Sequence, residues 1–334
     1  MKNGFILCFL GSWFFINCQS PQTDIKPLHT LAFGSCNRTD LNREIWKSIV
    51  AKQPEAWVWL GDIVYTDNQS MEDLASKYEL QKQLPAYRQL SANSKIFGVW
   101  DDHDFGDNDA GSSFSKKRES KELLFQFLEM PEDHPAQKRE GAYQKYCFGT
   151  GAQKVCLYLL DVRYFKEDYE IDPSPLQRYK KNSGLLLGKE QWSWLENELA
   201  TSDAAVHLFG GGIQLLSSEH PYEKWANFPM AQQRFYDLLK KYKIANPIYL
   251  SGDRHIAEVS AKELATNYWL YDVTSSGLTH SYATLEEEFN PYRISPLLTH
   301  LNFGMLTLDW NSRNILIEIF NDEGIATYSK NIPF

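Results

Sequence analysis

An apolar strand that ends in an acidic turn is encoded in residues 56–65, Ala56-Trp57-Val58-Trp59-Leu60-Gly61-Asp62-Ile63-Val64-Tyr65. Its first five residues are all apolar and are bounded by a glycine, which predicts a short strand over Ala56–Leu60. Gly61 and Asp62 then predict a tight turn that presents a carboxylate directly beyond the strand. The same arrangement, an apolar run followed at once by polar residues, recurs along the chain.

Five further polar clusters follow strand candidates in this way. They are Gly34-Ser35-Cys36-Asn37 after Leu31–Phe33, Asp101-Asp102-His103-Asp104 after Ile96–Trp100, Asp161-Val162-Arg163 after Val155–Leu160, Gly210-Gly211-Gly212-Ile213-Gln214 after Ala205–Phe209, and Gly252-Asp253-Arg254-His255 after Ile248–Leu250. In an open α/β sheet, ligands bind in the crevice beyond the carboxyl ends of the strands. We therefore expect all six clusters to converge on one site.

The remaining apolar patterns predict the fold class. Helical periodicity is expected at Leu41–Lys52, Gly188–Ala200 and Met230–Lys243, between the strand candidates. The end of the chain is rich in strand candidates, at Trp269–Thr274, Gly304–Trp310, Ile315–Phe320 and Ile325–Tyr328. Alternating strands and helices followed by a run of strands predict an α/β sandwich with mixed sheets in a single domain.

Composition restricts the function classes. The chain has 334 residues, of which 43% are hydrophobic and 23% are charged, so it is not a disordered chain. Its formal net charge is −9 and it has no long basic tract, which argues against a nucleic-acid-binding surface. No apolar run approaches the roughly 20 residues that a spanning helix needs. We expect a monomer.

The first residues resemble a targeting segment. Lys2 precedes an uncharged apolar run at Gly4–Ile16, and a basic start followed by such a run is typical of a signal peptide over residues 1–17. Cys18 stands where a bacterial lipobox places its lipidated cysteine, although Asn17 replaces the usual small residue. Ordinary signal-peptidase cleavage nearby remains open. We expect residues 18–27 to form a tether, and the protein to be exported to the periplasm or cell envelope, anchored through Cys18.

The other cysteines raise a separate question. Cys147 and Cys156 flank Gly149-Thr150-Gly151, with strand-like residues on both sides, which predicts a hairpin. An exported protein can form disulfides, so these cysteines are either a cross-strand disulfide or two buried thiols. Cys36 then has no cysteine partner, so a disulfide does not account for its presence and another role must.

The side chains of the six clusters indicate metal binding. So many acids cannot lie close together unless cations neutralise them. The thiol of Cys36, the phenol of Tyr65 and the imidazole of His255 suit a transition metal, especially ferric iron. The oxygen donors suit a hard cation such as Ca²⁺ or Mg²⁺. These are Asp102, Asp253 and, by its position alone, Gln214, with Asp62 as the natural bridge between two ions.

Five blocks of the sequence resemble the PhoD-like alkaline phosphatases, members of the calcineurin-like metallophosphoesterase superfamily. They are Phe33-Gly34-Ser35-Cys36, Leu60-Gly61-Asp62-Ile63-Val64-Tyr65, Trp100-Asp101-Asp102-His103-Asp104, Leu160-Asp161-Val162-Arg163 and Ser251-Gly252-Asp253-Arg254-His255. The resemblance extends over about residues 28–280. It implies that residues 28–334 form a catalytic domain with a four-layer α/β/β/α fold. It also implies a dinuclear Fe(III)–Ca(II) centre, with Zn, Mn or Mg as alternatives.

The resemblance implies hydrolysis of phosphate monoesters or diesters by a hydroxide that two metal ions activate. Asp102 and His103 occupy the positions of the superfamily's ligand asparagine and catalytic histidine. His103 would then donate a proton to the leaving alkoxide, with Asp101 or Asp104 orienting its ring. Arg163 would clamp the phosphate oxygens. Trp225 and Phe228 are candidates for the rim of the cleft.

Other interpretations account for parts of the pattern. Cys36 could be a nucleophile, but this leaves the acidic clusters unexplained. The Asp101–Asp109 segment could be a solvated acidic loop or a calcium loop, and which of its residues would bind a second metal stays open. No Gly-x-Ser-x-Gly elbow is present. From another class, the chain could be a cell-surface binding lipoprotein with a degenerate site.

Overall fold

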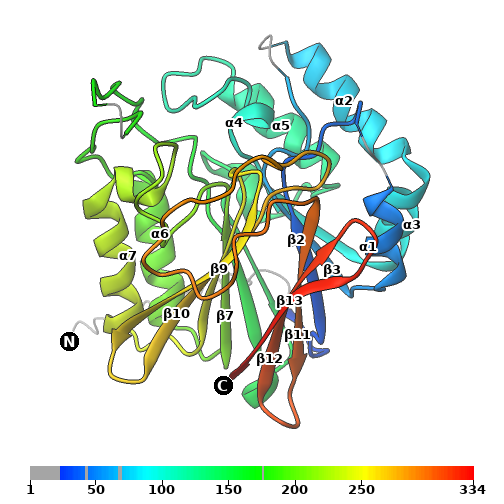
Figure 1. Cartoon of the computed structure of the whole chain (residues 1–334), viewed down its shortest axis with the longest axis vertical. Coiled ribbons are helices and arrows are strands. Elements are labelled where there is room, and N and C mark those ends of the chain that lie inside the picture. Colours follow the sequence, from blue (N-terminus) through cyan, green and yellow to red (C-terminus); the bar gives the residue numbers. More distant parts are fainter. Residues whose placement is uncertain (1–22, 42–43, 67–69, 175–176) are drawn as a thin grey trace, which may run out of the picture.

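The computed structural model describes residues 23–41, 44–66, 70–174 and 177–334, whose strands form two facing mixed sheets (Figure 1). The first sheet has the order β1 (Thr23–Asp24), β5 (Gln144–Phe148), β6 (Val155–Leu159), β7 (Val206–Gly211), β8 (Pro247–Ser251), β10 (Tyr268–Ser275) and β9 (Ala257–Ala265). The second has the order β13 (Ala326–Pro333), β12 (Asn314–Asn321), β11 (Asn302–Asp309), β2 (Thr30–Gly34), β3 (Ala56–Leu60) and β4 (Lys95–Val99).

Helices cover the outer face of each sheet (Figure 1). Beside the second sheet lie α1 (Ile45–Ala51), α2 (Met71–Gln83), α3 (Pro85–Asn93) and α5 (Lys117–Phe127). Beside the first sheet lie α6 (Gly188–Ala200) and α7 (Pro229–Lys241). The short α4 (Asp102–Phe105) and three 3-10 turns, Pro135–Lys138, Gly151–Gln153 and Trp225–Asn227, lie in the connections. The four-layer α/β/β/α prediction is confirmed.

Strand β3 shows why the layers pack as they do. Its residues alternate between two faces, and Trp57 and Trp59 both point to the helical side. There the Trp46 ring of α1 lies 5.3 Å from that of Trp57 and 5.2 Å from that of Trp59, centroid to centroid. On the other face, Leu60 reaches the first sheet, because a Cβ added to Gly210 of β7 would lie 3.1 Å from its Cδ2. Glycine therefore permits the two sheets to approach closely at this end.

The parallel strands bring their carboxyl ends to one edge. Strands β2, β3 and β4 run parallel in the second sheet, as do β6, β7, β8 and β10 in the first. The segment after β10 crosses to the second sheet, where the N–H groups of Leu278 and Thr279 donate to the carbonyls of Ser35 and Cys36 at 3.2 and 3.4 Å. The ends of β2 and β10 are thus tied together, and the polar clusters of both sheets face one region.

The structure describes only part of the N-terminal segment for which a signal peptide and a tether were predicted. Residues 1–22, with the predicted signal peptide and Cys18, lie outside the described residues. Thr23 and Asp24 of the predicted tether form β1 and pair with Cys147 and Phe148 of β5, so this part of the tether belongs to a sheet. Among the described residues, no helix is both long and apolar enough to cross a bilayer.

The hairpin of β5 and β6 carries a disulfide. Cys147 and Cys156 stand directly opposite each other in the antiparallel register, and their sulfurs are bonded. Of the two alternatives that the sequence left open, the structure has the cross-strand disulfide. Cys36 is the free cysteine of the described residues, and it is buried.

A buried histidine in β7 gives the fold a pH dependence. The Nδ1 of His207 donates to the carbonyl of Ala245, so Nε2 accepts from the Ser202 hydroxyl, both at 2.8 Å. Burial lowers the pKa of His207 to about 4. Since the folded pKa is below the unfolded value of about 6.5, the stability that the neutral ring contributes is lost as pH falls through this window.

We expect this single group to remove about 2–3 kcal/mol of unfolding free energy between pH 7 and pH 4.5. The His207→Gln variant should show a correspondingly flatter profile, because glutamine takes up no proton. Urea unfolding of both proteins at the two pH values measures the difference. Parallel profiles would show that His207 is not held neutral in the fold.

Candidate metal centre

Four of the predicted ligands lie on strained backbone at strand ends. Cys36, Asp62, Asp253 and His255 have φ values of 61°, 48°, 68° and 55°. Residues other than glycine seldom adopt such left-handed conformations, and they cluster at functional sites. The strain turns each chain sharply at the edge of its sheet, so the side chain points into the region between the two sheets' ends.

Asp62 is the centre of one group of donors. Its Oδ2 accepts from the Tyr65 hydroxyl at 2.9 Å and from the Cys36 thiol at 3.5 Å. Its Oδ1 lies 3.4 Å from the backbone N–H of His103. A thiol, a phenol and a carboxylate thus meet at one point, as expected for a residue that bridges two ions.

An aromatic group closes this side of the site. The Tyr65 ring lies 4.1 Å from the His103 ring and 6.5 Å from the His255 ring, centroid to centroid. His280, which the sequence analysis missed, lies 4.2 Å from His255 and 5.1 Å from Tyr65. Its signal was present, because Ser275-Ser276-Gly277-Leu278-Thr279-His280 is one more polar cluster directly after a strand.

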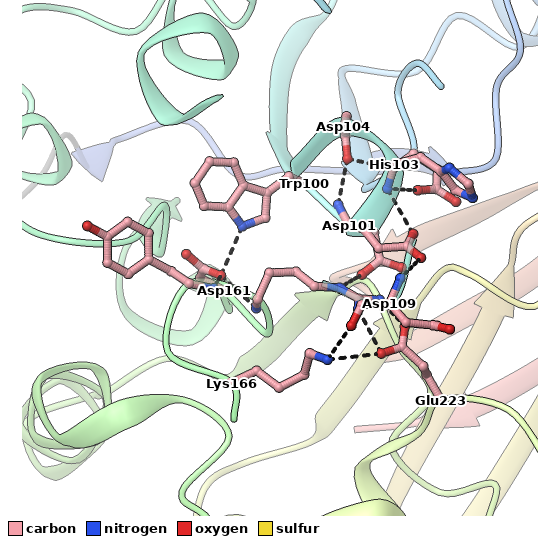
Figure 2. A network of polar contacts seen from close by, with 12 residues as sticks. Trp100, Asp101, His103, Asp104, Asp109, Asp161, Lys166 and Glu223 are labelled. Atoms are coloured by element: carbon pink, nitrogen blue, oxygen red, sulfur yellow. Dashed lines mark hydrogen bonds and ion pairs between the residues drawn. The ribbon is translucent and has the colours of Figure 1, made fainter. Parts of the chain in front are cut away.

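Asp102 belongs to two groups of possible metal ligands. Donor atoms of Asp62, Asp102 and His103 lie within 4.8 Å of one another, and so do those of Asp102, Asp109 and Glu223. Figure 2 shows Asp109 and Glu223 close together beside Asp101. Asp109 falls in the segment whose ligand the sequence left open, whereas Glu223 was missed, because it lies in the loop between β7 and α7 and follows no strand directly.

The carboxylate of Asp104 has a structural task. It accepts from the backbone N–H groups of Asp101 at 2.7 Å and of Asp62 and Ile63 at 3.1 Å each. These bonds fix the turn after β3 against α4 and so hold Asp62 in place. Figure 2 shows Asp104 beside Asp101. Asp101 bonds Arg163 instead. Both carboxylates thus have structural partners besides the His103 ring, which one of them was expected to orient.

Two acidic side chains of the site, Asp62 and Asp253, have strongly raised pKa values in the metal-free protein. Burial, and then the nearby Asp102 charge, raises the pKa of Asp62 well above its usual range. Burial and the charges of Glu223 and Asp102 do the same to the pKa of Asp253. Cations among these groups would remove the penalty, because they stabilise the ionised carboxylates.

Other donors are already in the form that binds a metal. Burial would raise the pKa of Asp102, but the Arg163 guanidinium and the His103 imidazole lower it to about 2. Burial lowers the pKa of His255 to about 3, so its ring is neutral at neutral pH. An ionised carboxylate and a neutral imidazole are ligand forms, and the mixed donor set fits a transition metal together with a cation such as Ca²⁺ or Mg²⁺.

Gln214 has one buried oxygen to offer. Its Nε2 donates to Glu258 and to Thr274, both at 2.8 Å, which fixes the orientation of the amide. Its Oε1 is buried, and no described residue donates to it. Buried polar atoms are nearly always satisfied, so this oxygen calls for a partner that the protein does not supply. A hard cation would fit.

The position of Arg163 differs from the one that a phosphate clamp requires. The side chain is fully buried, and its Nε donates to Asp101 at 2.6 Å. Its two terminal nitrogens donate to the two oxygens of Glu223 at 2.8 and 2.5 Å. Lys166 supports the same carboxylate at 3.3 Å (Figure 2). Because both edges of the guanidinium face carboxylates and none of it is exposed, this geometry does not support the phosphate clamp.

The expected rim residues are also elsewhere. Trp225 and Phe228 are fully buried, and the Trp225 Nε1 donates to the Tyr249 hydroxyl at 3.0 Å. They belong to the core between α6, α7 and the first sheet rather than to the mouth of the site. Their side chains face inward, so the prediction that they line the rim was wrong.

The fold is a four-layer α/β/β/α sandwich. Its strand ends carry thiol, phenol, imidazole and carboxylate donors, an arrangement that suits a metal-dependent phosphatase. The chain belongs to the PhoD-like phosphatase family, whose family model matches residues 31–275. The family resemblance drawn from the sequence is thus confirmed.

A curated relative and a solved structure show how far the likeness extends. Alkaline phosphatase D of Bacillus subtilis (strain 168) is 23% identical over 273 residues, which cover 70% of this chain and 47% of that protein. The chain therefore spans about half the length of this curated relative. A solved structure described as PhoD superposes with a TM-score of 0.67 at 18% identity, over 93% of this chain and 69% of that one. This match supports the fold.

Proposed function

We propose that the chain is a metal-dependent phosphoesterase that hydrolyses phosphate monoesters or diesters. The observation that carries the proposal is the convergence of metal-binding side chains from both sheets on one edge of the sandwich. Membership of the PhoD-like phosphatase family, and the alkaline phosphatase activity named for the Bacillus relative, point to the same chemistry.

We assign the donors to two cations, Fe(III) and Ca(II). Cys36, Tyr65 and His255 would hold the iron, Asp102, Asp253 and Gln214 the calcium, and Asp62 would lie between them. When bound, the cations would neutralise the carboxylates and lower the pKa of a water molecule that attacks phosphorus. The raised pKa values of Asp62 and Asp253 support cation binding at this site, because a cation would stabilise the ionised form of each carboxyl.

The protein's own residues would orient the site and move the proton. Asp104 holds the turn that carries Asp62, and Arg163 holds Asp101 and Glu223. His103 is partly exposed beside Tyr65, which suits a group that must reach a leaving oxygen. We propose His103 as the general acid that protonates the departing alkoxide.

The leaving group tests this role. We expect His103→Ala to lower turnover of glycerol phosphate by about 10²–10⁴-fold, the range for a positioned proton donor. Turnover of p-nitrophenyl phosphate should fall much less, because p-nitrophenolate leaves without a proton. Steady-state rates on both esters, with elemental analysis of the same preparation, measure the effect. Equal losses on both esters together with loss of metal would make His103 a ligand instead.

A substrate panel tests the function as a whole. Wild-type protein should contain iron and calcium and should hydrolyse p-nitrophenyl phosphate, bis(p-nitrophenyl) phosphate or both. The alternative, a binding lipoprotein with a degenerate site, predicts no hydrolysis of either ester at any metal loading. It is disfavoured because every predicted ligand position keeps a side chain that can bind a metal.

We also propose that the protein is exported and anchored in the cell envelope through Cys18. The basis is the basic and apolar run before Cys18 and the short polar stretch after it. Metabolic labelling with a fatty acid tests the anchor, since a cleaved but unlipidated protein would carry no label.

A further inference from the structure

Two partly exposed tyrosines lie next to the candidate metal centre. Tyr222, from the loop between β7 and α7, and Tyr282, from the segment after β10, are 37% and 38% exposed. The Tyr282 ring lies 4.9 Å from the ring of His255, centroid to centroid. The Tyr222 ring lies 6.4 Å from that of Tyr282, and the two planes are within 28° of parallel. Trp225 and Phe228 do not form the rim, but these two rings can.

Both rings make cation–π contacts with Arg254. Its guanidinium is buried and lies 4.6 Å from the Tyr222 centroid and 5.9 Å from that of Tyr282. It also forms a 2.7 Å ion pair with Glu288, which ties the segment after β10 to the site. Cation–π contact restrains each ring, and the exposed parts of the two side chains stay accessible to a ligand.

The backbone adds a second restraint. The N–H of Tyr282 donates to the carbonyl of His255 at 2.9 Å, so the tyrosine is fixed relative to a predicted metal ligand. Tyrosine loses little conformational entropy on binding because it has only two side-chain torsions. The pair is therefore preorganised, and it lies directly beside the place where a phosphate would be held.

We propose that Tyr282 and Tyr222 form a stacking platform for a flat aromatic ring in the alcohol part of a phosphate ester. The inference rests on the proposed function, because the phosphate would be held at the metal centre beside His255. It narrows the substrate class to esters such as nucleoside or aryl phosphates. Stacking of a base on an aromatic side chain is worth about 1–3 kcal/mol, or about 5- to 150-fold in affinity.

Paired ligands isolate the ring from the phosphate. Adenosine 5′-monophosphate and ribose 5-phosphate share the sugar and phosphate, and phenyl phosphate carries an aryl ring without a sugar. Calorimetry on the metal-loaded protein, with both ligands supplied as phosphonate analogues that cannot be hydrolysed, should give at least about 5-fold tighter binding of the adenosine 5′-monophosphate analogue than of the ribose 5-phosphate analogue. Tyr282→Ala should remove this preference and leave the affinity for ribose 5-phosphate unchanged. Tyr282→Phe should keep it, because the ring and not the hydroxyl is needed.

A distant aromatic residue provides the control. Trp269 is 43% exposed at the opposite end of β10 from the site, and Trp269→Ala should keep the full preference. Equal wild-type affinity for adenosine 5′-monophosphate and ribose 5-phosphate, or failure of both to bind, would overturn the platform. So would a preference that survives the double change Tyr222→Ala and Tyr282→Ala. A preference for adenosine 5′-monophosphate without one for phenyl phosphate would restrict the platform to nucleosides.

The two proposals fail separately. Absence of hydrolysis of every ester in the panel would reject the phosphoesterase, whatever the calorimetry shows. Hydrolysis without a preference for the aromatic ligand would reject only the platform.

Discussion

Replacing Asp62 by asparagine should lower metal content and ester hydrolysis by about 100-fold or more. Residues that merely orient a ligand typically cost 10–100-fold, and Asp62 is the carboxylate to which Cys36 and Tyr65 both point. Asparagine keeps the shape and can still accept from Tyr65, so the fold should survive. It removes the negative charge that a bridging ligand needs.

The same change should affect folding stability in the opposite direction. Because the pKa of Asp62 is raised in the folded chain, this carboxyl lowers the free energy of unfolding as pH rises above its ordinary unfolded value, and the full loss is reached above the raised pKa. Asp62→Asn removes this penalty, so the metal-free variant should be at least as stable as the metal-free wild type. Metals should then stabilise the wild type, but not the variant, because only a protein that binds them gains from them.

Thermal unfolding with and without iron and calcium, combined with elemental analysis, measures both effects. Asp168→Asn is the matched control, since this carboxylate is exposed and should leave every quantity unchanged. An Asp62→Asn protein that keeps its metals and its activity would remove Asp62 from the centre. A variant that unfolds even without metals would assign it to the fold instead.

The sequence predicted that the candidate ligands lie at strand ends because such positions depend on local patterns. Asp62 and Asp253 each follow an apolar run and a glycine, and this pattern alone places them at a strand end. Parallel strands then bring such ends to one edge without further information. His280 obeys the same rule after β10, so it was within reach of the sequence analysis and was overlooked.

Other parts of the site depend on contacts that no local pattern records. Glu223 lies in a loop, and its importance comes from Arg163, which is 60 positions away in the sequence. Without this partner in view, Arg163 was interpreted as a residue that faces the substrate. Asp109 gains its place only because its backbone N–H donates to Asp102 at 2.8 Å and so closes the loop.

Helices α2, α3 and α5 and strand β9 are among the elements that had no sequence-based expectation, for related reasons. Helix α2 buries only Leu74, Tyr78 and Gln81, so its apolar periodicity is weak, and α3 and α5 are short and polar on most positions. Strand β9 is rich in Ala, Glu, Lys and Leu, which favour helices. It is a strand because it pairs with β10 over eight registered positions, an example of tertiary context overriding propensity.

Arg163→Met should destabilise the fold by about 3–5 kcal/mol, the usual cost of removing one partner of a buried ion pair. The side chain is fully buried, and its loss leaves the carboxylates of Asp101 and Glu223 without their main counter-charge. Lys166 makes only one longer contact of 3.3 Å with Glu223, so it cannot replace the bidentate ion pair of Arg163 with Glu223. A chemical unfolding curve measures the loss. Arg118→Met, at an exposed pair with Glu140, is the control and should leave stability nearly unchanged, because water screens an exposed ion pair.

A second substitution separates the two roles of Arg163. If it serves mainly to balance Glu223, the double variant Arg163→Met with Glu223→Gln should be more stable than Arg163→Met alone, because the second change removes the charge that the first leaves unpaired. If Arg163 clamps the substrate, Arg163→Met should keep wild-type stability and lose affinity for inorganic phosphate. Adding Glu223→Gln should then not restore that affinity. The closed geometry of the guanidinium favours the first outcome, since a group bonded on both edges and shielded from solvent must break those bonds before it can reach a phosphate.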